Sequence, residues 1–132
     1  MLLVDSSVWI DFFNGRSTTQ ALYLRDQADL SQIATGDLIL CEVLQGFRSE
    51  CDLKATQELL LSFHYHDMGG KIVSLQSAEN YRYLRQRGIT VRKTIDMLIA
   101  TFCISHKLQL LHADRDFDTM EEYLGLQVVH PL

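Results

Sequence analysis

Two short apolar runs, each followed by an aspartate, constrain the fold of this chain more than any other feature. Leu2-Leu3-Val4 ends at Asp5, and the run from Leu108 to Ala113 ends at Asp114. A short apolar run bounded by polar residues is typical of a strand that is buried on both faces. Between these runs, apolar residues recur at helical spacing, for example over residues 72–84. Strands that alternate with helices predict an α/β fold with a short, mainly parallel sheet covered on both faces.

The remaining segments fit the same alternation. Asn14-Gly15 and Gly36-Asp37 are expected breaks, and no repeat, linker or low-complexity stretch divides the chain, so we expect one domain over residues 1–132. The predicted helices are 6–13, one from Thr18 onward, one from Glu42, 52–63, one from Thr94 through Cys103, and 116–124; the further predicted strands are 38–40 and 126–129.

Composition bounds the class of protein. The chain has 132 residues, of which 47% are hydrophobic, which is enough for one packed core. Its formal net charge of −5 argues against a protein that holds nucleic acid by general electrostatics. The three cysteines form no CxxC pair, so we expect reduced thiols in a cytoplasmic protein. Asp5 interrupts the N-terminal apolar run and no run approaches about 20 residues, so neither a signal peptide nor a membrane span is expected.

Four acids fall at predicted strand-to-helix junctions. Asp5 and Asp114 each follow a strand, Glu42 follows the weak strand at 38–40, and Asp96 lies in the first turn of a helix. Ligands of open α/β sheets gather outside the carboxyl ends of the strands. Carboxylates crowded there repel one another unless protons or a cation relieve them. Mg²⁺ and Mn²⁺ prefer such oxygen ligands and can activate water against a phosphodiester, so the pattern favours metal-dependent phosphodiester hydrolysis.

Each acid also has a structural interpretation, which the sequence leaves open. Asp5 is a candidate N-cap for the helix that follows it, and Asp96 is well placed to interact with a helix dipole. Glu42 is a candidate solvated helix residue, and Asp114 and Asp116 are candidate turn formers.

The amino-acid sequences of three segments resemble those of a known protein family. VDSSVWIDF at 4–12, CEVLQGFRS at 41–49 and TIDMLIATFCISHKLQLLHADRDFD at 94–118 are together similar to PIN domains of the VapC toxin type, in the family's order and from end to end of the chain. The last segment is the most specific of the three. The resemblance implies an α/β/α sandwich and RNA cleavage that depends on Mg²⁺ or Mn²⁺.

The same resemblance implies residue roles. It makes Asp5, Glu42, Asp96 and Asp114 the acidic site, with Asp5 and Asp96 as direct metal ligands and the other two completing the site. Asp116 lies at a position that is often acidic in similar proteins and is a weaker candidate. Ser6 matches a small hydroxyl residue beside the first Asp, and is a candidate for binding a phosphate or a metal-bound water.

Basic and apolar residues suggest the partners. Arg92, Lys93 and Arg115 are candidates for binding RNA phosphates, whereas Arg82 and Arg85 are more simply explained as a solvated helix face. The resemblance implies a homodimer and a small antitoxin, whose arginine would enter the acidic site and displace the metal. The apolar residues of the early helices are candidates for an exposed patch that contacts either partner: Trp9, Phe13, Leu22 and Leu24.

Other classes of protein share some of these features. A signalling receiver domain also binds Mg²⁺ in an acidic α/β pocket, but it needs paired acids after the first strand, and here Ser6-Ser7 follow Asp5. A catalytically silent PIN-like module that binds RNA or a partner is disfavoured because all four acids are present. A housekeeping RNA-processing nuclease without an antitoxin stays open.

Overall fold

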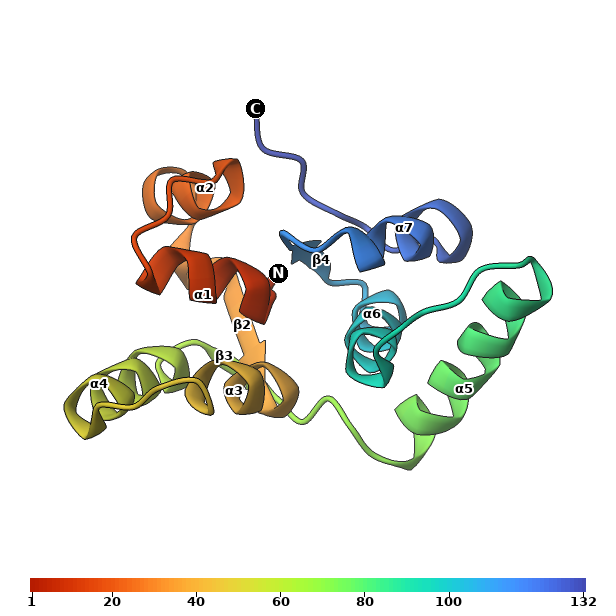
Figure 1. The fold of residues 1–132 in the computed structure, drawn as a ribbon, viewed down its shortest axis with the longest axis horizontal. Coiled ribbons are helices and arrows are strands. Elements are labelled where there is room, and N and C mark those ends of the chain that lie inside the picture. Colours follow the sequence, from red (N-terminus) through yellow and green to blue (C-terminus); the bar gives the residue numbers. More distant parts are fainter.

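The computed structural model describes residues 1–132 as a four-stranded parallel sheet between two layers of helices (Figure 1). The strand order is β3-β2-β1-β4, so β1 lies in the interior between β2 and β4. In Figure 1, α1 to α4 lie in the left half of the view and α5 to α7 lie in the right half. The strands are β1 (Leu2–Val4), β2 (Ile33–Gly36), β3 (His64–His66) and β4 (Gln109–Leu111). The helices are α1 (Ser6–Phe13), α2 (Thr19–Asp26), α3 (Asp37–Leu44), α4 (Glu50–Leu61), α5 (Lys71–Gln86), α6 (Thr94–His106) and α7 (Asp118–Leu124), with short 3-10 helices η1 (Leu30–Gln32) and η2 (Arg115–Phe117). The predicted α/β class and parallel sheet are confirmed.

The register between β1 and β4 determines where the functional side chains meet. Val4 pairs with Leu111 at the carboxyl ends of the two strands, and the backbone N–H of Asp5 donates to the Leu111 carbonyl at 2.9 Å. Because the two strands run parallel, the residues that follow them leave the sheet at the same edge.

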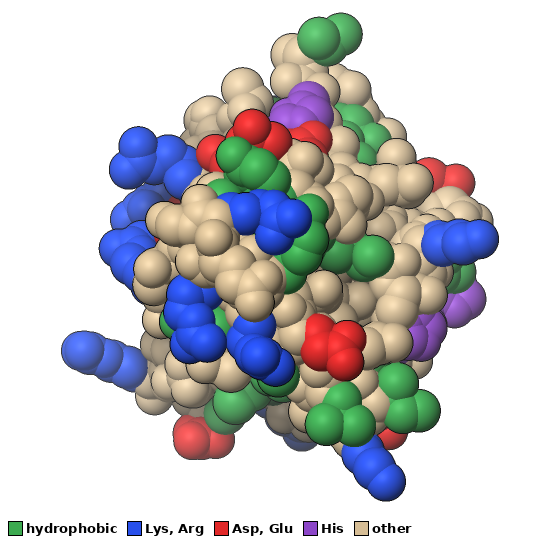
Figure 2. All heavy atoms as spheres, turned by 90° about the vertical axis from the view of Figure 1, so that its right-hand side faces the viewer, with side chains coloured by type: hydrophobic (Ala, Val, Ile, Leu, Met, Phe, Trp, Pro, Cys, Tyr) green, Lys and Arg blue, Asp and Glu red, His purple; other side chains and the backbone are tan.

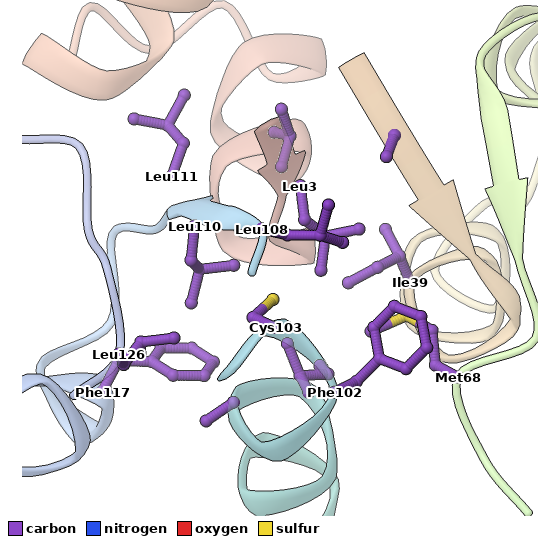
Figure 3. Close-up of a cluster of buried hydrophobic side chains, with 14 of the residues drawn as sticks. Leu3, Ile39, Met68, Phe102, Cys103, Leu108, Leu110, Leu111, Phe117 and Leu126 are labelled. Atoms are coloured by element: carbon purple, nitrogen blue, oxygen red, sulfur yellow. The ribbon is translucent and has the colours of Figure 1, made fainter. Parts of the chain in front are cut away.

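A cluster of buried apolar side chains holds α6 against the sheet (Figure 3). Val4, Leu110 and Leu111 are fully buried, as expected for strands covered on both faces. Figure 3 shows Phe102 and Cys103 of α6 beneath strand residues Leu3 and Leu110, with Phe117 and Leu126 to one side and Ile39 and Met68 to the other. The core therefore fixes α6, and with it the N-terminal turn that carries Asp96, relative to the edge of the sheet where β1 and β4 end.

The predicted strand at 38–40 is wrong. Residues 33–36 form β2, and 38–40 belong to α3, where Ile39 and Val43 are buried one helical turn apart. A short apolar run does not distinguish a strand from a buried helix. The break at Gly36 is real but ends a strand. A Cβ there would lie 2.6 Å from the His66 backbone carbonyl oxygen and 2.5 Å from the Met68 side chain, so only glycine permits this packing of β2 against β3 and the segment after it.

The predicted last strand at 126–129 is also wrong as an element. This segment makes a single bridge, Leu110 with Val128, beside β4. The Gln127 carbonyl accepts from Leu110 N at 2.8 Å, and Val129 N donates to the Leu110 carbonyl at 3.0 Å. Two hydrogen bonds hold the segment against the edge strand without extending the ladder further. None of the helices has the length and apolar character needed to cross a membrane.

Candidate active site

The carboxylates of Asp5, Glu42, Asp96 and Asp114, which we call the acidic cluster, reach one edge of the sheet from four separate segments. Asp5 follows β1 directly and Asp114 follows β4. Asp96 lies in the first turn of α6, and Glu42 lies in α3. Asp5, Asp114 and Glu42 each raise the pKa of Asp96 through their negative charges, which places all four within electrostatic reach of one another.

Asp5 is a buried carboxylate with one oxygen committed and one free. Its residue is 2% exposed. Oδ2 caps α1 by accepting from Ser7 N at 3.0 Å, and it also accepts from Ser7 Oγ at 2.6 Å. Oδ1 is buried and has no hydrogen-bond partner. Burial raises the pKa of Asp5 despite the Ser7 hydrogen bonds. The predicted helix cap is thus present, yet it uses only half of the carboxylate.

Asp96 is a second buried carboxylate of the acidic cluster with a raised pKa. The residue is 3% exposed, and its Oδ2 accepts no hydrogen bond. The nearest cation is the Lys93 ammonium, 4.0 Å from Oδ2. Burial first, and then the charge of Asp5, raise the pKa of Asp96 to about 7. A buried carboxylate with an unsatisfied oxygen is unfavourable unless a proton or a cation compensates it.

Glu42 and Ser6 form a pair at the side of the acidic cluster. Ser6 Oγ donates to Glu42 Oε1 at 3.0 Å. Burial raises the pKa of Glu42, and the negative charges of Asp5 and Asp114 add to that shift. Ser6 therefore orients a carboxylate, a contact that differs from the phosphate or water contact expected of it from the sequence.

Asp114 differs from the other three because its carboxylate accepts a hydrogen bond from a cation. Its Oδ1 accepts from Asp116 N at 2.9 Å, and Lys93 Nζ lies 3.2 Å from Oδ2. Although burial acts in the opposite direction, these two contacts lower the pKa of Asp114 below its usual value. Asp116 is held in turn by Arg92, at 3.0 Å. Arg115 is exposed and makes no ion pair.

The oxygens available at this site suit a hard divalent cation. Asp96, Asp114 and Asp116 each offer a carboxylate oxygen, and these atoms lie within 4.8 Å of one another. Asp5 adds an unpartnered buried oxygen. An all-oxygen set of carboxylates is what Mg²⁺ and Mn²⁺ prefer, and a cation would compensate the charge that raises the pKa of Asp96. The residues present therefore fit a metal of this class. Asp116 was a weaker candidate from the sequence, and its distance to Asp96 and Asp114 makes it a stronger candidate ligand.

Ser7 is a site residue that sequence reasoning missed. Its hydroxyl donates to Asp5 Oδ2 and also accepts from Ala113 N at 3.0 Å. It thereby ties the residue after β1 to the segment after β4. The available signal was the position of Asp5 itself, because an N-cap side chain bonds to the backbone N–H two or three residues further on.

The comparisons with known proteins agree with this arrangement. The model of the PIN domain family matches residues 2–123. The chain belongs to the PIN domain family. Ribonuclease VapC11 of Mycobacterium tuberculosis is 29% identical over 129 residues, which are 96% of this chain and 96% of that protein.

Two solved structures show the same PIN fold. A chain of the toxin–antitoxin complex from Klebsiella pneumoniae is 25% identical, with a TM-score of 0.66 over 100% of this chain and 98% of its own. FitAcB from Neisseria gonorrhoeae has a TM-score of 0.72 at 17% identity, over 99% of this chain and 98% of that chain. The predicted family and its α/β/α sandwich are confirmed.

Proposed function

We propose that this PIN domain is an endoribonuclease that hydrolyses RNA phosphodiester bonds with a divalent cation, Mg²⁺ or Mn²⁺. The observation that carries the proposal is the acidic cluster itself: four carboxylates from separate segments at one sheet edge, two of them buried with an oxygen that has no hydrogen-bond partner. Such a cluster is unfavourable for the fold alone and is typical of a cation site. The 29% identity to a protein named a ribonuclease supports RNA as the substrate.

Different side chains of this protein have different roles in the proposed hydrolysis. When bound, a divalent cation of this class lowers the pKa of water and stabilises charge that develops on phosphate oxygens. Asp96, Asp114 and Asp116 would bind this cation jointly, and Asp5 would supply a further oxygen. Ser7 holds Asp5 in place and Ser6 orients Glu42. No nucleophilic side chain is required.

Basic side chains beside the acidic cluster are proposed to receive the RNA phosphates. Lys93 pairs with Asp114, and Arg92 pairs with Asp116. Both basic side chains are largely exposed, so they can exchange a carboxylate for a phosphate when RNA and cation are bound. Arg115 is the third candidate. Because such a substrate is found in the cytoplasm, we place the protein there.

We further propose that the protein is the toxin of a toxin–antitoxin pair. The likeness to a chain of the Klebsiella pneumoniae toxin–antitoxin complex supports this role. The predicted apolar patch is only partly exposed, because Trp9 and Leu24 are buried. They instead line an apolar groove of about 500 Å³ with Phe12, Leu30, Leu59 and Phe63, which suits an apolar helix face of an antitoxin. An antitoxin arginine is well suited to pair with the acidic cluster.

The proposed homodimer has its own candidate surface. Ile72 and Leu75 in the first turns of α5 are 72% and 60% exposed. Large apolar side chains exposed together are typical of protein contacts. Light scattering of the purified chain tests this proposal.

Expression in the native host tests the toxin role. We expect wild-type protein alone to arrest growth, and we expect the product of the neighbouring short gene to relieve the arrest. Cells that express Asp5→Asn should grow normally because a ligand oxygen is lost. Cells that express Asp52→Asn, which changes the exposed start of α4, should still arrest. If the soluble wild-type chain is expressed alone without arrest, a housekeeping nuclease or a silent module becomes the better interpretation.

A further inference from the structure

The basic residues of this acidic chain are concentrated in one segment. Residues 82–93 contain Arg82, Arg85, Arg87, Arg92 and Lys93 and no acidic residue, although the net charge of the chain is −5. The segment covers the end of α5 and the loop that leads into α6. Figure 2 views the side of the molecule formed by α5 to α7, and most of its Lys and Arg side chains lie in the left half of that view. The positive charge of residues 82–93 therefore belongs to the side of the molecule that α5 and the start of α6 form.

A groove of about 440 Å³ lies between α5 and α6 within this surface, and we call it the basic groove. Arg82 and Arg85 line its α5 side, and Thr94 lines its α6 side. Ser74 and Tyr81 add hydroxyl groups to the same lining. The Arg85 guanidinium lies 5.7 Å from the centre of the Tyr81 ring. The groove thus combines two cations, several hydroxyls and one aromatic ring.

Arg82 and Arg85 of the basic groove, and Arg87 beside them at the end of α5, have no acidic partner. No carboxylate lies within 4.0 Å of Arg82, Arg85 or Arg87, whereas Arg92 and Lys93 are paired with Asp116 and Asp114. Arg82 and Arg85 lie three residues apart on a helix, which separates their Cβ atoms by about 5–6 Å. Two adjacent, unpaired guanidinium groups are suited to consecutive phosphates of one strand.

The position of the basic groove connects it with the acidic cluster. Thr94, which lines the groove and is the first residue of α6, directly follows Lys93, whose ammonium lies 3.2 Å from Asp114 Oδ2. Asp96 lies two residues further along the same first turn of α6. A strand bound in the groove can therefore pass over the N-terminus of α6 to reach the acidic cluster.

We propose that the basic groove binds the ribose–phosphate backbone of single-stranded RNA on one side of the bond to be cleaved. This inference rests on the proposed ribonuclease function and adds the path of the substrate. Arg82 and Arg85 bind phosphates, and the Tyr81 ring is the one aromatic surface in the groove available to a base. The solvated helix face expected for Arg82 and Arg85 from the sequence becomes a substrate surface. A second copy of this chain is a less suitable ligand for the basic groove than RNA, because two copies that each carry a net charge of −5 repel each other.

Binding measurements on a cleavage-deficient protein test the basic groove. In the Asp96→Asn background, Arg82→Gln/Arg85→Gln is compared with Arg48→Gln/Lys54→Gln, which removes the same charge from exposed positions near and on α4, on the opposite side of the molecule in Figure 1. The probe is a fluorescently labelled mixed-sequence single-stranded RNA of about 20 nucleotides. The groove variant should lower the slope of log affinity against log salt by about 1.4, or about 0.7 for each lost phosphate contact. The ratio of wild-type affinity to groove-variant affinity should therefore fall by about 25-fold as the salt concentration rises from about 0.1 M to about 1 M. The control variant should keep the wild-type slope.

Three outcomes separate the possibilities. A selective loss of slope in the groove variant supports the proposal. Equal slopes in the two double variants overturn it, even if wild-type protein cleaves RNA. Loss of a homodimer in the groove variant, seen by light scattering, shows that the face joins two copies and also overturns it. If wild-type protein cleaves no RNA with either cation, the proposed function fails independently of these binding results.

Discussion

Asp96→Asn should lower the rate of RNA cleavage by at least about 100-fold while leaving the protein folded. Asp96 has a buried, unpartnered oxygen, and its pKa is raised to about 7. Loss of a residue that only supports a metal ligand commonly costs about 10–100-fold in metal affinity or activity, so loss of a direct ligand should cost more. The measurement is the initial rate of cleavage at saturating Mg²⁺, beside circular dichroism of the same preparation.

Asp52→Asn serves as the matched control, because it removes one carboxylate charge from an exposed helix start. It should cleave at the wild-type rate. Wild-type rates in both variants would show that Asp96 has no part in the reaction and that the site is misplaced.

Without a divalent cation, the wild-type protein should become less stable as pH rises from about 4 to about 7. The pKa of Asp96 is about 7 in the folded protein, whereas the ordinary pKa of an aspartate side chain is 3.8. Between these values the folded state binds more protons than the unfolded state, so the free energy of unfolding falls with pH. The loss for this group is up to about 4 kcal/mol and is complete above pH of about 7. Asp114, whose pKa is lowered, acts in the opposite direction, but only below the ordinary pKa of an aspartate.

Urea unfolding in excess EDTA at about pH 5 and about pH 8 measures this effect. Asp96→Asn should be more stable than wild type at the higher pH, and its advantage should grow by about 3 kcal/mol between the two conditions. Adding Mg²⁺ at the higher pH should restore stability to the wild type and much less to the variant. A difference between the two proteins that does not change with pH would contradict the assigned environment of Asp96.

The sequence predicted the positions of the acids because each is tied to a local signal. Asp5 and Asp114 end apolar runs that are long enough to be recognised as strands, and Asp96 opens a helix with a clear apolar face. The architecture then brings such residues together, since parallel strands end at the same edge. Glu42 was assigned to the acidic site on the resemblance, and it lies beside Ser6 in the structure, although the strand expected before it proved to be part of its own helix, α3.

The features that sequence reasoning missed depend on contacts between distant segments. Ser7 joins Asp5 to Ala113 across 106 positions of the chain, and no local pattern encodes that hydrogen bond. The requirement for Gly36 comes from the His66 carbonyl and the Met68 side chain, which only the packing of β2 against β3 and the segment after it brings near. Likewise, Arg82 and Arg85 look like an ordinary solvated helix face until α6 is placed beside α5 and a groove forms between the two helices.

Cleavage of RNA by the purified wild-type protein in the presence and absence of metal tests the central claim most directly. A labelled RNA is incubated with the protein in Mg²⁺ or Mn²⁺, in excess EDTA, and in EDTA followed by an excess of the cation. The account predicts cleavage with either cation, none in the chelator, and recovery when the cation is returned, because the carboxylates of the acidic cluster need it to act on a phosphate. Cleavage that continues unchanged in excess EDTA would contradict the account.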